Sequence, residues 1–362
     1  MVSAGQLVAG PRGRRLLLAF AQAGEQPGAD EVMRLCIAVR ALSMRLARER
    51  GDAVSGFGRG VPPDISAATP EEVAALLERV PLAPATPVRL REALRASVDA
   101  AMYWQEPDAD DLVCALPAVR AALVRVAEHL AGSPTVQTWA APADLTDQWV
   151  LAWDAEPPLP LADLEVWRDA TIAAEAAARR ERPADPRANW SGEWWSHPPQ
   201  GLIASTGTFA DGNPVGLWLV EDSAGWTEAT AHRIRAAAPS RVYEIDGAAS
   251  WAALCREFPL DVTALRRHDW YRTTDRSGPW VLPDWTGIAG RYDAVHLSIA
   301  GYLAAATTAI EVDDSASVIA GWNPDTTWWL GDTTHRTGEQ VRWHSAADGS
   351  TWVSGGAVTD PR

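Results

Sequence analysis

Apolar residues recur every three or four positions along residues 14–50, which is the repeat of one face of an α-helix. Between positions 33 and 46 arginines lie among these apolar residues, which would form one broad apolar face of the helix. The members of this face are Met33, Cys36, Ile37, Val39, Leu42, Met44 and Leu46. The pattern predicts an amphipathic helical segment that buries this face.

Helix-start signals continue after this segment. Residues 69–72 read Thr-Pro-Glu-Glu, which supplies an N-cap threonine, a first-turn proline and a capping-box acid. Further helices are predicted from about residue 87, from residue 117 and over about 161–182. No alternating strand pattern precedes residue 185, so the sequence predicts an all-helical N-terminal domain over 1–185.

The pattern changes after a proline-rich segment. Residues 181–201 hold four prolines and no repeat, which predicts a linker over 186–201. Apolar runs typical of strands then occur at 216–222, 241–246, 292–299, 315–322 and 326–330. Helix-like runs between them cover 224–238, 250–259 and a stretch around 301–309. These elements predict a tryptophan-rich α/β domain over 202–350 with a tail at 351–362, and an α+β fold class for the chain.

The composition limits the class of protein, the cellular compartment and the ligands that we expect for this chain. Apolar residues make up 47% and charged residues 22%, as in globular proteins, and no uncharged apolar stretch reaches 18 residues. The formal charge of −15 disfavours broad nucleic-acid binding. Cys36, Cys114 and Cys255 are isolated thiols, and arginines interrupt the apolar start of the chain, so we expect a cytoplasmic protein without a signal peptide. No side chains have metal-ligand spacing, so no metal site is predicted.

The chain contains no lysine, and all 32 basic residues are arginine. A P-loop and a protein kinase each need a lysine at the phosphates, and pyridoxal enzymes and Schiff-base aldolases need a lysine amine. These classes are therefore excluded. The sequence also lacks the G-x-S-x-G motif of α/β-hydrolases and the G-x-G-x-x-G motif of dinucleotide-binding folds.

Tryptophan is concentrated in the second half, with fourteen of nineteen residues from Trp190 onward. One interpretation is a core filled by indoles, and the other is a stacking wall for a planar ligand such as a nucleobase or nicotinamide. The stretch 268–285 adds aromatic, proline and charged residues without a repeat. It is predicted to be a long structured loop, which is either a surface cover or a functional element.

Two polar positions in predicted strands are candidates for chemistry. In the run 292–298, alternation places Ala294, His296 and Ser298 on one face, so His296 is either catalytic or a satisfied structural residue. Asp325 lies in Asn-Pro-Asp-Thr after a buried-looking run. This segment is either an ordinary turn or a polar strand end that points into a cleft.

Residues 194–330 resemble a group of proteins of unassigned activity from high-GC bacteria, through the strings GLWLVED, RVYEI, PDW, YDAVHLS and AGWNPD. The order of elements is also similar, at the level of fold, to the split sheet of ADP-ribosyltransferases. That resemblance implies a strand at GLWLVED, a helix at AGWTEATAHR and a strand at RVYEID. In that family a late glutamate contacts the ribose of NAD. The position that fits best here is Asp325, an aspartate.

The first functional hypothesis is an NAD-dependent ADP-ribosyltransferase-like enzyme. Asp325 or Glu244 would stabilise the oxocarbenium-like ribose that forms as nicotinamide leaves, and His296 is a further catalytic candidate. Arginine forks suit the diphosphate and aromatic rings suit the bases. The cofactor-binding candidates are Arg241, Trp270, Tyr271, Arg272, Trp285, Arg291 and Trp322.

Two further hypotheses belong to other classes. One is a non-catalytic module whose tryptophan-lined pocket binds a nucleotide or peptide, with the helical half docking a protein partner. The other is an unrelated hydrolase that uses Asp284, Asp293 and His296.

Overall fold

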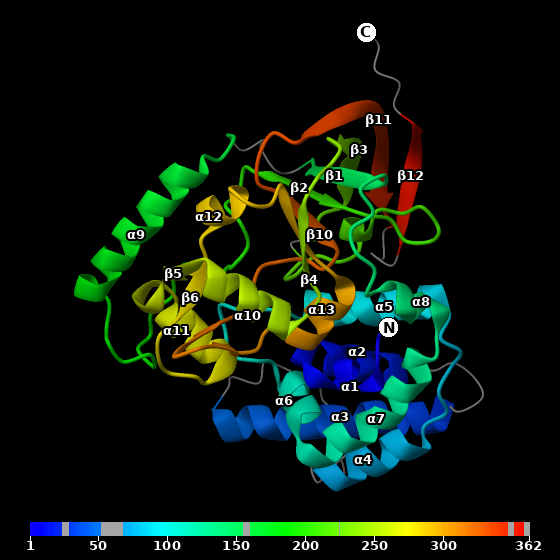
Figure 1. Ribbon diagram of the computed structural model, residues 1–362. Helices are drawn as coiled ribbons and strands as arrows, with labels where there is room; N and C mark the ends of the chain where they lie inside the picture. The colour runs from blue at the N-terminus through cyan, green and yellow to red at the C-terminus, as the bar shows by residue number, and fades with distance from the viewer. Residues whose placement is uncertain (24–28, 52–67, 155–159, 224, 347–350, 358–362) are drawn as a thin grey trace.

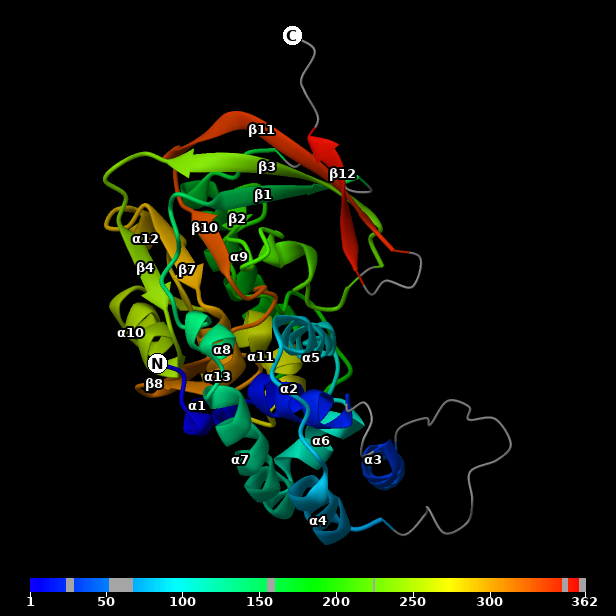
Figure 2. The same ribbon diagram turned by 90° about the vertical axis from the view of Figure 1, so that its right-hand side faces the viewer.

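The computed structural model describes residues 1–23, 29–51, 68–154, 160–223, 225–346 and 351–357. A helical N-terminal half packs beneath a C-terminal half built on a mixed eight-stranded sheet, as Figures 1 and 2 show. The fold is α+β, as the sequence predicts. Among the helices that these residues form, none combines the length and apolarity needed to cross a membrane.

Three of the N-terminal helices begin at the predicted start signals, at Pro70, Pro87 and Pro117. The N-terminal helices are α1 (Ala4–Ala9), α2 (Pro11–Gln22), α3 (Ala29–Arg50), α4 (Pro70–Arg79), α5 (Pro87–Asp99), α6 (Ala109–Ala115), α7 (Pro117–Ala131) and α8 (Pro134–Thr138). At α4 the Thr69 side chain accepts from the Glu72 backbone N–H, and the Glu72 side chain accepts from the Thr69 backbone N–H. The predicted capping box is therefore confirmed.

The sheet has the order β12-β11-β3-β1-β2-β10-β7-β4. Its strands are β1 (Gln148–Trp153), β2 (Ile203–Thr206), β3 (Glu228–Ala236), β4 (Val242–Ile245), β7 (Ala294–Leu297), β10 (Thr326–Trp329), β11 (Thr334–Ser345) and β12 (Trp352–Ala357). Only β4 and β7 run parallel among these neighbours.

Smaller elements surround the sheet. They are α9 (Leu164–Glu181), η2 (Val215–Leu217), α10 (Ala248–Glu257), β5 (Pro259–Asp261), α11 (Thr263–Thr274), β6 (Val281–Pro283), α12 (Trp285–Ala289), α13 (Ile299–Ala305), β8 (Ile310–Val312) and β9 (Ser315–Ser317). Strand β5 pairs with β6, and β8 pairs with β9. Helix α9 lies along one flank of the molecule, where it contacts α11 and α12 (Figure 1).

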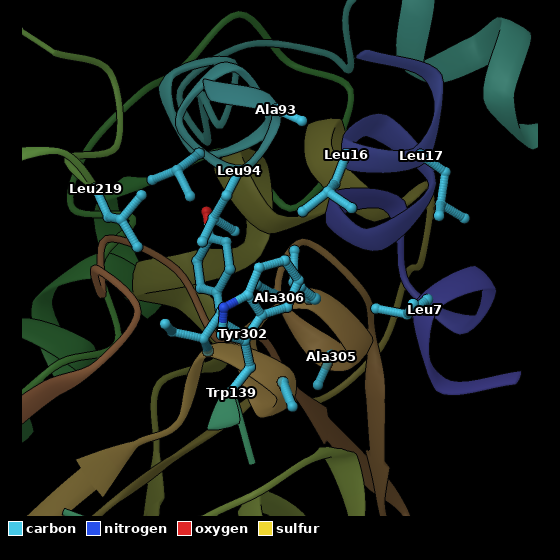
Figure 3. Packing of buried hydrophobic residues seen from close by; sticks show 14 of the residues in the cluster. Leu7, Leu16, Leu17, Ala93, Leu94, Trp139, Leu219, Tyr302, Ala305 and Ala306 are labelled. Atoms are coloured by element: carbon cyan, nitrogen blue, oxygen red, sulfur yellow. The ribbon is translucent and has the colours of Figure 1, made fainter. Parts of the chain in front are cut away.

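The two halves share a hydrophobic core. Figure 3 shows Leu7 and Leu16 of the N-terminal helices close to Tyr302 on α13, and all three are essentially buried. A Cβ at Gly10 would lie only 2.4 Å from the Leu303 carbonyl oxygen. Glycine therefore allows the start of α2 to approach the backbone of α13 closely.

A polar cluster is enclosed in this shared core, and we name it the interhalf cluster. Arg12 of α2 forms an ion pair with Asp111 of α6. The Glu221 Oε1 accepts hydrogen bonds from the hydroxyls of Tyr103 (2.6 Å) and Tyr302 (2.7 Å). Burial of the Glu221 carboxylate raises its pKa to about 7, although the two hydroxyls and the charge of Arg12 act in the opposite direction.

Two predicted elements of the C-terminal half are wrong. The run 216–222 is not a strand but contains the short helix η2, and the run 224–238, predicted as a helix, contains strand β3. Alanines with good helix propensity suggested the helix. Pairing on both edges, with β1 and β11, overrides that preference and buries Ala229 and Ala231 on one face.

The prediction that residues 1–185 are all helical is also wrong. Strand β1 lies inside the sheet between β3 and β2. Its six residues, QWVLAW, are too short and too apolar to give a clear alternation. The sheet therefore uses a strand from each side of the predicted linker.

Two further predictions need correction. The stretch 268–285 is not one loop, because it contains the end of α11, strand β6 and the start of α12. The predicted tail at 351–362 includes β12, which pairs with β11, while 358–362 lie outside the described residues. Strand β11 itself carries many exposed polar residues, and for this reason the apolar pattern did not reveal it.

Candidate functional site

A buried histidine lies between two carboxylates at one end of the sheet. His296 on β7 and Glu244 on β4 are register partners, so their side chains leave the sheet on the same face. The His296 Nδ1 lies 2.6 Å from Glu244 Oε2, and its Nε2 lies 3.6 Å from Asp325 Oδ1. We name these three residues the acid–histidine trio. The structure thus brings together all three predicted catalytic residues.

Asp325 is held at the start of β10 by its backbone and by its side chain. It adopts a left-handed conformation with φ of 61°, which aspartate tolerates better than most residues. Its backbone N–H donates to the Leu297 carbonyl at 2.8 Å. Its Oδ2 accepts from the Gly207 N–H at 2.9 Å and from the Thr206 hydroxyl at 3.0 Å. These contacts fix the direction of the carboxylate.

Glu244 is oriented from the opposite side of the imidazole. Its Oε1 accepts from the Ala143 N–H at 3.1 Å, in the connection that leads to β1. The side chains of Glu244 and Asp325 remain 33% and 24% exposed, whereas that of His296 is 2% exposed. A ligand can therefore reach both carboxylates, but it reaches the imidazole only through them.

The electrostatics of the trio favour a charged histidine. Burial alone would lower the pKa of His296, but the hydrogen-bonding and charges of Asp325 and Glu244 together raise it to about 9. At neutral pH an imidazolium thus lies between two carboxylates. The trio suits two kinds of chemistry. The fixed histidine can transfer a proton, and the partly exposed carboxylates can stabilise a cation beside them.

A tryptophan-lined pocket lies on the opposite face of the sheet from His296 and Glu244, because its strand residues pair with Leu297 and Val295 and not with His296. It has a volume of about 140 Å³, and its walls include Trp149, Trp153 and Trp328. Thr206 and Thr326 also line this pocket. Thr206 donates a hydrogen bond to Asp325, and Thr326 follows Asp325 in the chain. The His197 ring stacks on Trp328 with centroids 4.9 Å apart, which supports the indole from behind. Burial lowers the pKa of His197 to about 4, so this support is neutral at physiological pH.

The sequence did not identify these lining residues as a site. Strand β1 contributes Trp149 and Trp153 with Leu151 between them, and the other lining residues come from β2 and β10, far away in the chain. One signal was present: Trp149 and Trp153 are four residues apart, which places both on one face of a strand.

The predicted aromatic cofactor-binding residues lie elsewhere. Trp285 and Trp322 pack with Trp251 in the core, and Trp270 packs with Trp280. None of the three predicted tryptophans is more than 1% exposed. Tyr271 is half-buried on α11, with the Arg187 guanidinium over its ring.

The predicted arginines have partners outside the trio. Arg241 pairs with Asp293 and Arg291 with Glu257. Arg272 pairs with Asp269 and also donates to the Trp104 carbonyl. The role of these residues in cofactor binding stays a prediction.

The two aspartates of the hydrolase hypothesis also have partners outside the trio. Asp284 caps α12 and pairs with Arg168, while Asp293 accepts from the Arg241 backbone. In the described part of the chain, no group of three histidine, cysteine or acidic side chains has the geometry to hold a metal ion.

No protein-family model, curated protein or solved structure matches this chain.

Proposed function

We propose that the protein is an enzyme that cleaves the bond between ribose and a nitrogen base, with ADP-ribosyl transfer from NAD as the first reaction to test. The observation that supports this most is the trio: two partly exposed carboxylates fixed by one buried histidine. A carboxylate next to an oxocarbenium-like sugar lowers the barrier to its formation.

Each part of the site has a role in this proposal. Asp325 stabilises the developing positive charge on the ribose, because hydrogen bonds from Thr206 and Gly207 hold its carboxylate in one direction. His296 fixes both carboxylates and reduces the net charge of the trio to −1.

A second candidate is a non-catalytic module that binds a planar ligand. One observation favours it: the lining of the pocket by Trp149, Trp153 and Trp328 includes hydroxyl and amide groups but no charged side chain among the described residues. Such a pocket can bind a base without acting on it.

The decisive experiment measures nicotinamide release at one saturating NAD concentration for wild type and Asp325→Asn. Asparagine tolerates the left-handed backbone and keeps the shape of the side chain while removing its charge. We expect turnover to fall by about a hundredfold or more, with little change in melting temperature.

Asp275→Asn is the matched control, since Asp275 is also a left-handed aspartate, with φ of 55°, at the end of α11. It should retain wild-type turnover. Equal rates for wild type and Asp325→Asn would remove Asp325 from the mechanism. No release by wild type would contradict the proposed reaction, and saturable NAD binding without release would favour the binding module.

A further inference from the structure

A second, larger aromatic pocket is lined by residues of α5, of β1, of the segment 217–227 and of β12. Its volume is about 340 Å³, which is within the range of about 300–1,000 Å³ for small-molecule sites. Four tryptophans line it: Trp153, Trp218, Trp226 and Trp352. We name it the distal pocket. Trp153 also lines the smaller pocket that contains Trp149 and Trp328.

Three of these indoles form a connected aromatic surface. Trp153 and Trp226 stack with centroids 4.7 Å apart and an interplanar angle of 23°. Trp352 is tilted against Trp153 at 5.7 Å. All three remain partly exposed, so aromatic surface is presented to the pocket. Core packing alone does not account for aromatic surface that faces solvent.

The fourth indole brings an unused hydrogen-bond donor. Trp218 is 5% exposed, and its Nε1 has no acceptor among the described residues. The Arg91 guanidinium lies 4.1 Å from the Trp218 ring centroid, which holds the ring in place. A buried N–H without a partner is unfavourable, so an acceptor oxygen from a ligand would stabilise this group.

Polar groups complete the lining. Arg95 and Asp99 are one turn apart on α5, and hydroxyls come from Ser223, Thr227 and Ser345. Asp99 Oδ1 accepts from the Ser223 N–H at 3.1 Å, which fixes this carboxylate. The pocket therefore combines aromatic faces with a guanidinium, a carboxylate and hydroxyls.

We propose that the distal pocket binds an uncharged saccharide. The C–H bonds on a pyranose face are attracted to the negative face of an indole, while the ring hydroxyls can bond to Asp99, Arg95 and the Trp218 N–H. A phosphate-bearing ligand fits less well, because the lining places a carboxylate beside its arginine and the whole chain carries a charge of −15. This inference does not depend on the ribosyl chemistry proposed for the trio.

The test is isothermal titration of the full chain with cellohexaose, maltohexaose, chitohexaose and AMP. We expect saturable binding of at least one hexasaccharide and none of AMP at the same concentration. Trp226→Ala should weaken that binding at least tenfold, and so should Asp99→Asn, which changes no packing volume. Trp190→Ala is the matched control, since Trp190 is 39% exposed and does not line the pocket. It should bind like wild type.

Three results would overturn the proposal. They are no binding of any hexasaccharide, binding that both Trp226→Ala and Asp99→Asn leave unchanged, and binding of AMP in place of the sugars. Because Asp325→Asn should leave saccharide binding unchanged, failure here is distinguishable from failure of the proposed enzymatic reaction.

Discussion

The acid–histidine trio and the interhalf cluster are both polar sets in a largely apolar protein, but they differ in access. In the interhalf cluster Arg12 and Asp111 are 1% and 8% exposed, and the hydroxyls of Tyr103 and Tyr302 point to Glu221. In the trio, both carboxylates reach solvent and only the histidine is buried. A set of charged groups enclosed in a core, out of reach of a ligand, serves the fold. A set that keeps two fixed charges at the surface can act on a ligand.

The largest effect on stability should come from Arg12→Met. Removing one partner of a buried ion pair leaves Asp111 with only the longer contact to Arg15, at 3.6 Å, and breaking such a pair costs about 3–5 kcal/mol. Urea unfolding should show this loss, and the double variant Arg12→Met with Asp111→Leu should recover much of it. If Arg12→Met unfolds like wild type, the buried pair of Arg12 and Asp111 does not stabilise the fold.

A smaller effect should appear in the pH dependence of stability. The folded pKa of His296, about 9, lies above the ordinary value of 6.5, so the folded state binds the proton more tightly. The contribution is complete below pH 6.5 and is lost as the pH rises through 9, on the order of 3 kcal/mol for this shift. Urea melts from pH 6 to pH 9.5 measure it. Glu244→Gln should flatten this slope, and an unchanged slope would contradict the pairing.

The interhalf cluster predicts a different pH window. Because the folded pKa of Glu221 is raised from 4.5 to about 7, the folded state holds this proton longer and stability falls as pH rises between these values. Glu221→Gln should remove that slope and leave the one between pH 6.5 and 9. Urea melts of Glu221→Gln and of Glu244→Gln would therefore show which pH slope belongs to the interhalf cluster and which to the trio. Loss of both slopes in one variant would mean that they are coupled.

The smallest effect should follow Tyr302→Phe. This change removes one of the two hydroxyls that donate to Glu221 and leaves the ring in the shared core, at a cost of about 1–2 kcal/mol. Nicotinamide release by the folded protein should remain at the wild-type rate, because the residue is not part of the trio. A fall in turnover without a fall in stability would mean that the two clusters communicate.

The sequence predicted the trio only as separate candidates. Strand alternation put His296 on a definite face, and the Asn-Pro-Asp segment marked Asp325 as a strand end or turn. Glu244 was within a recognised strand. Their meeting depends on the parallel pairing of β4 with β7 and on β10 lying next to β7. Pairing order is a tertiary property, and for that reason local pattern could not supply it.

The tryptophan predictions show the same limit. Enrichment after residue 190 was visible, but which indoles are buried was not. Trp270, Trp285 and Trp322 fill the core, whereas Trp149 and Trp153, in the half predicted as helical, line a pocket across the sheet from His296. An indole serves equally well as core filler and as a ligand platform, so its neighbours decide between the two uses.

What the sequence determined by itself was local: the N-terminal helices with their caps, the absence of lysine chemistry, and several of the short strands. These follow from apolar spacing and from hydrogen bonds between residues a few positions apart. The tertiary structure alone decided that β1 joins the sheet, that 228–236 is a strand, and that Glu244, His296 and Asp325 meet. Each of these depends on contacts between residues far apart in the chain, whose energies no local window of sequence contains.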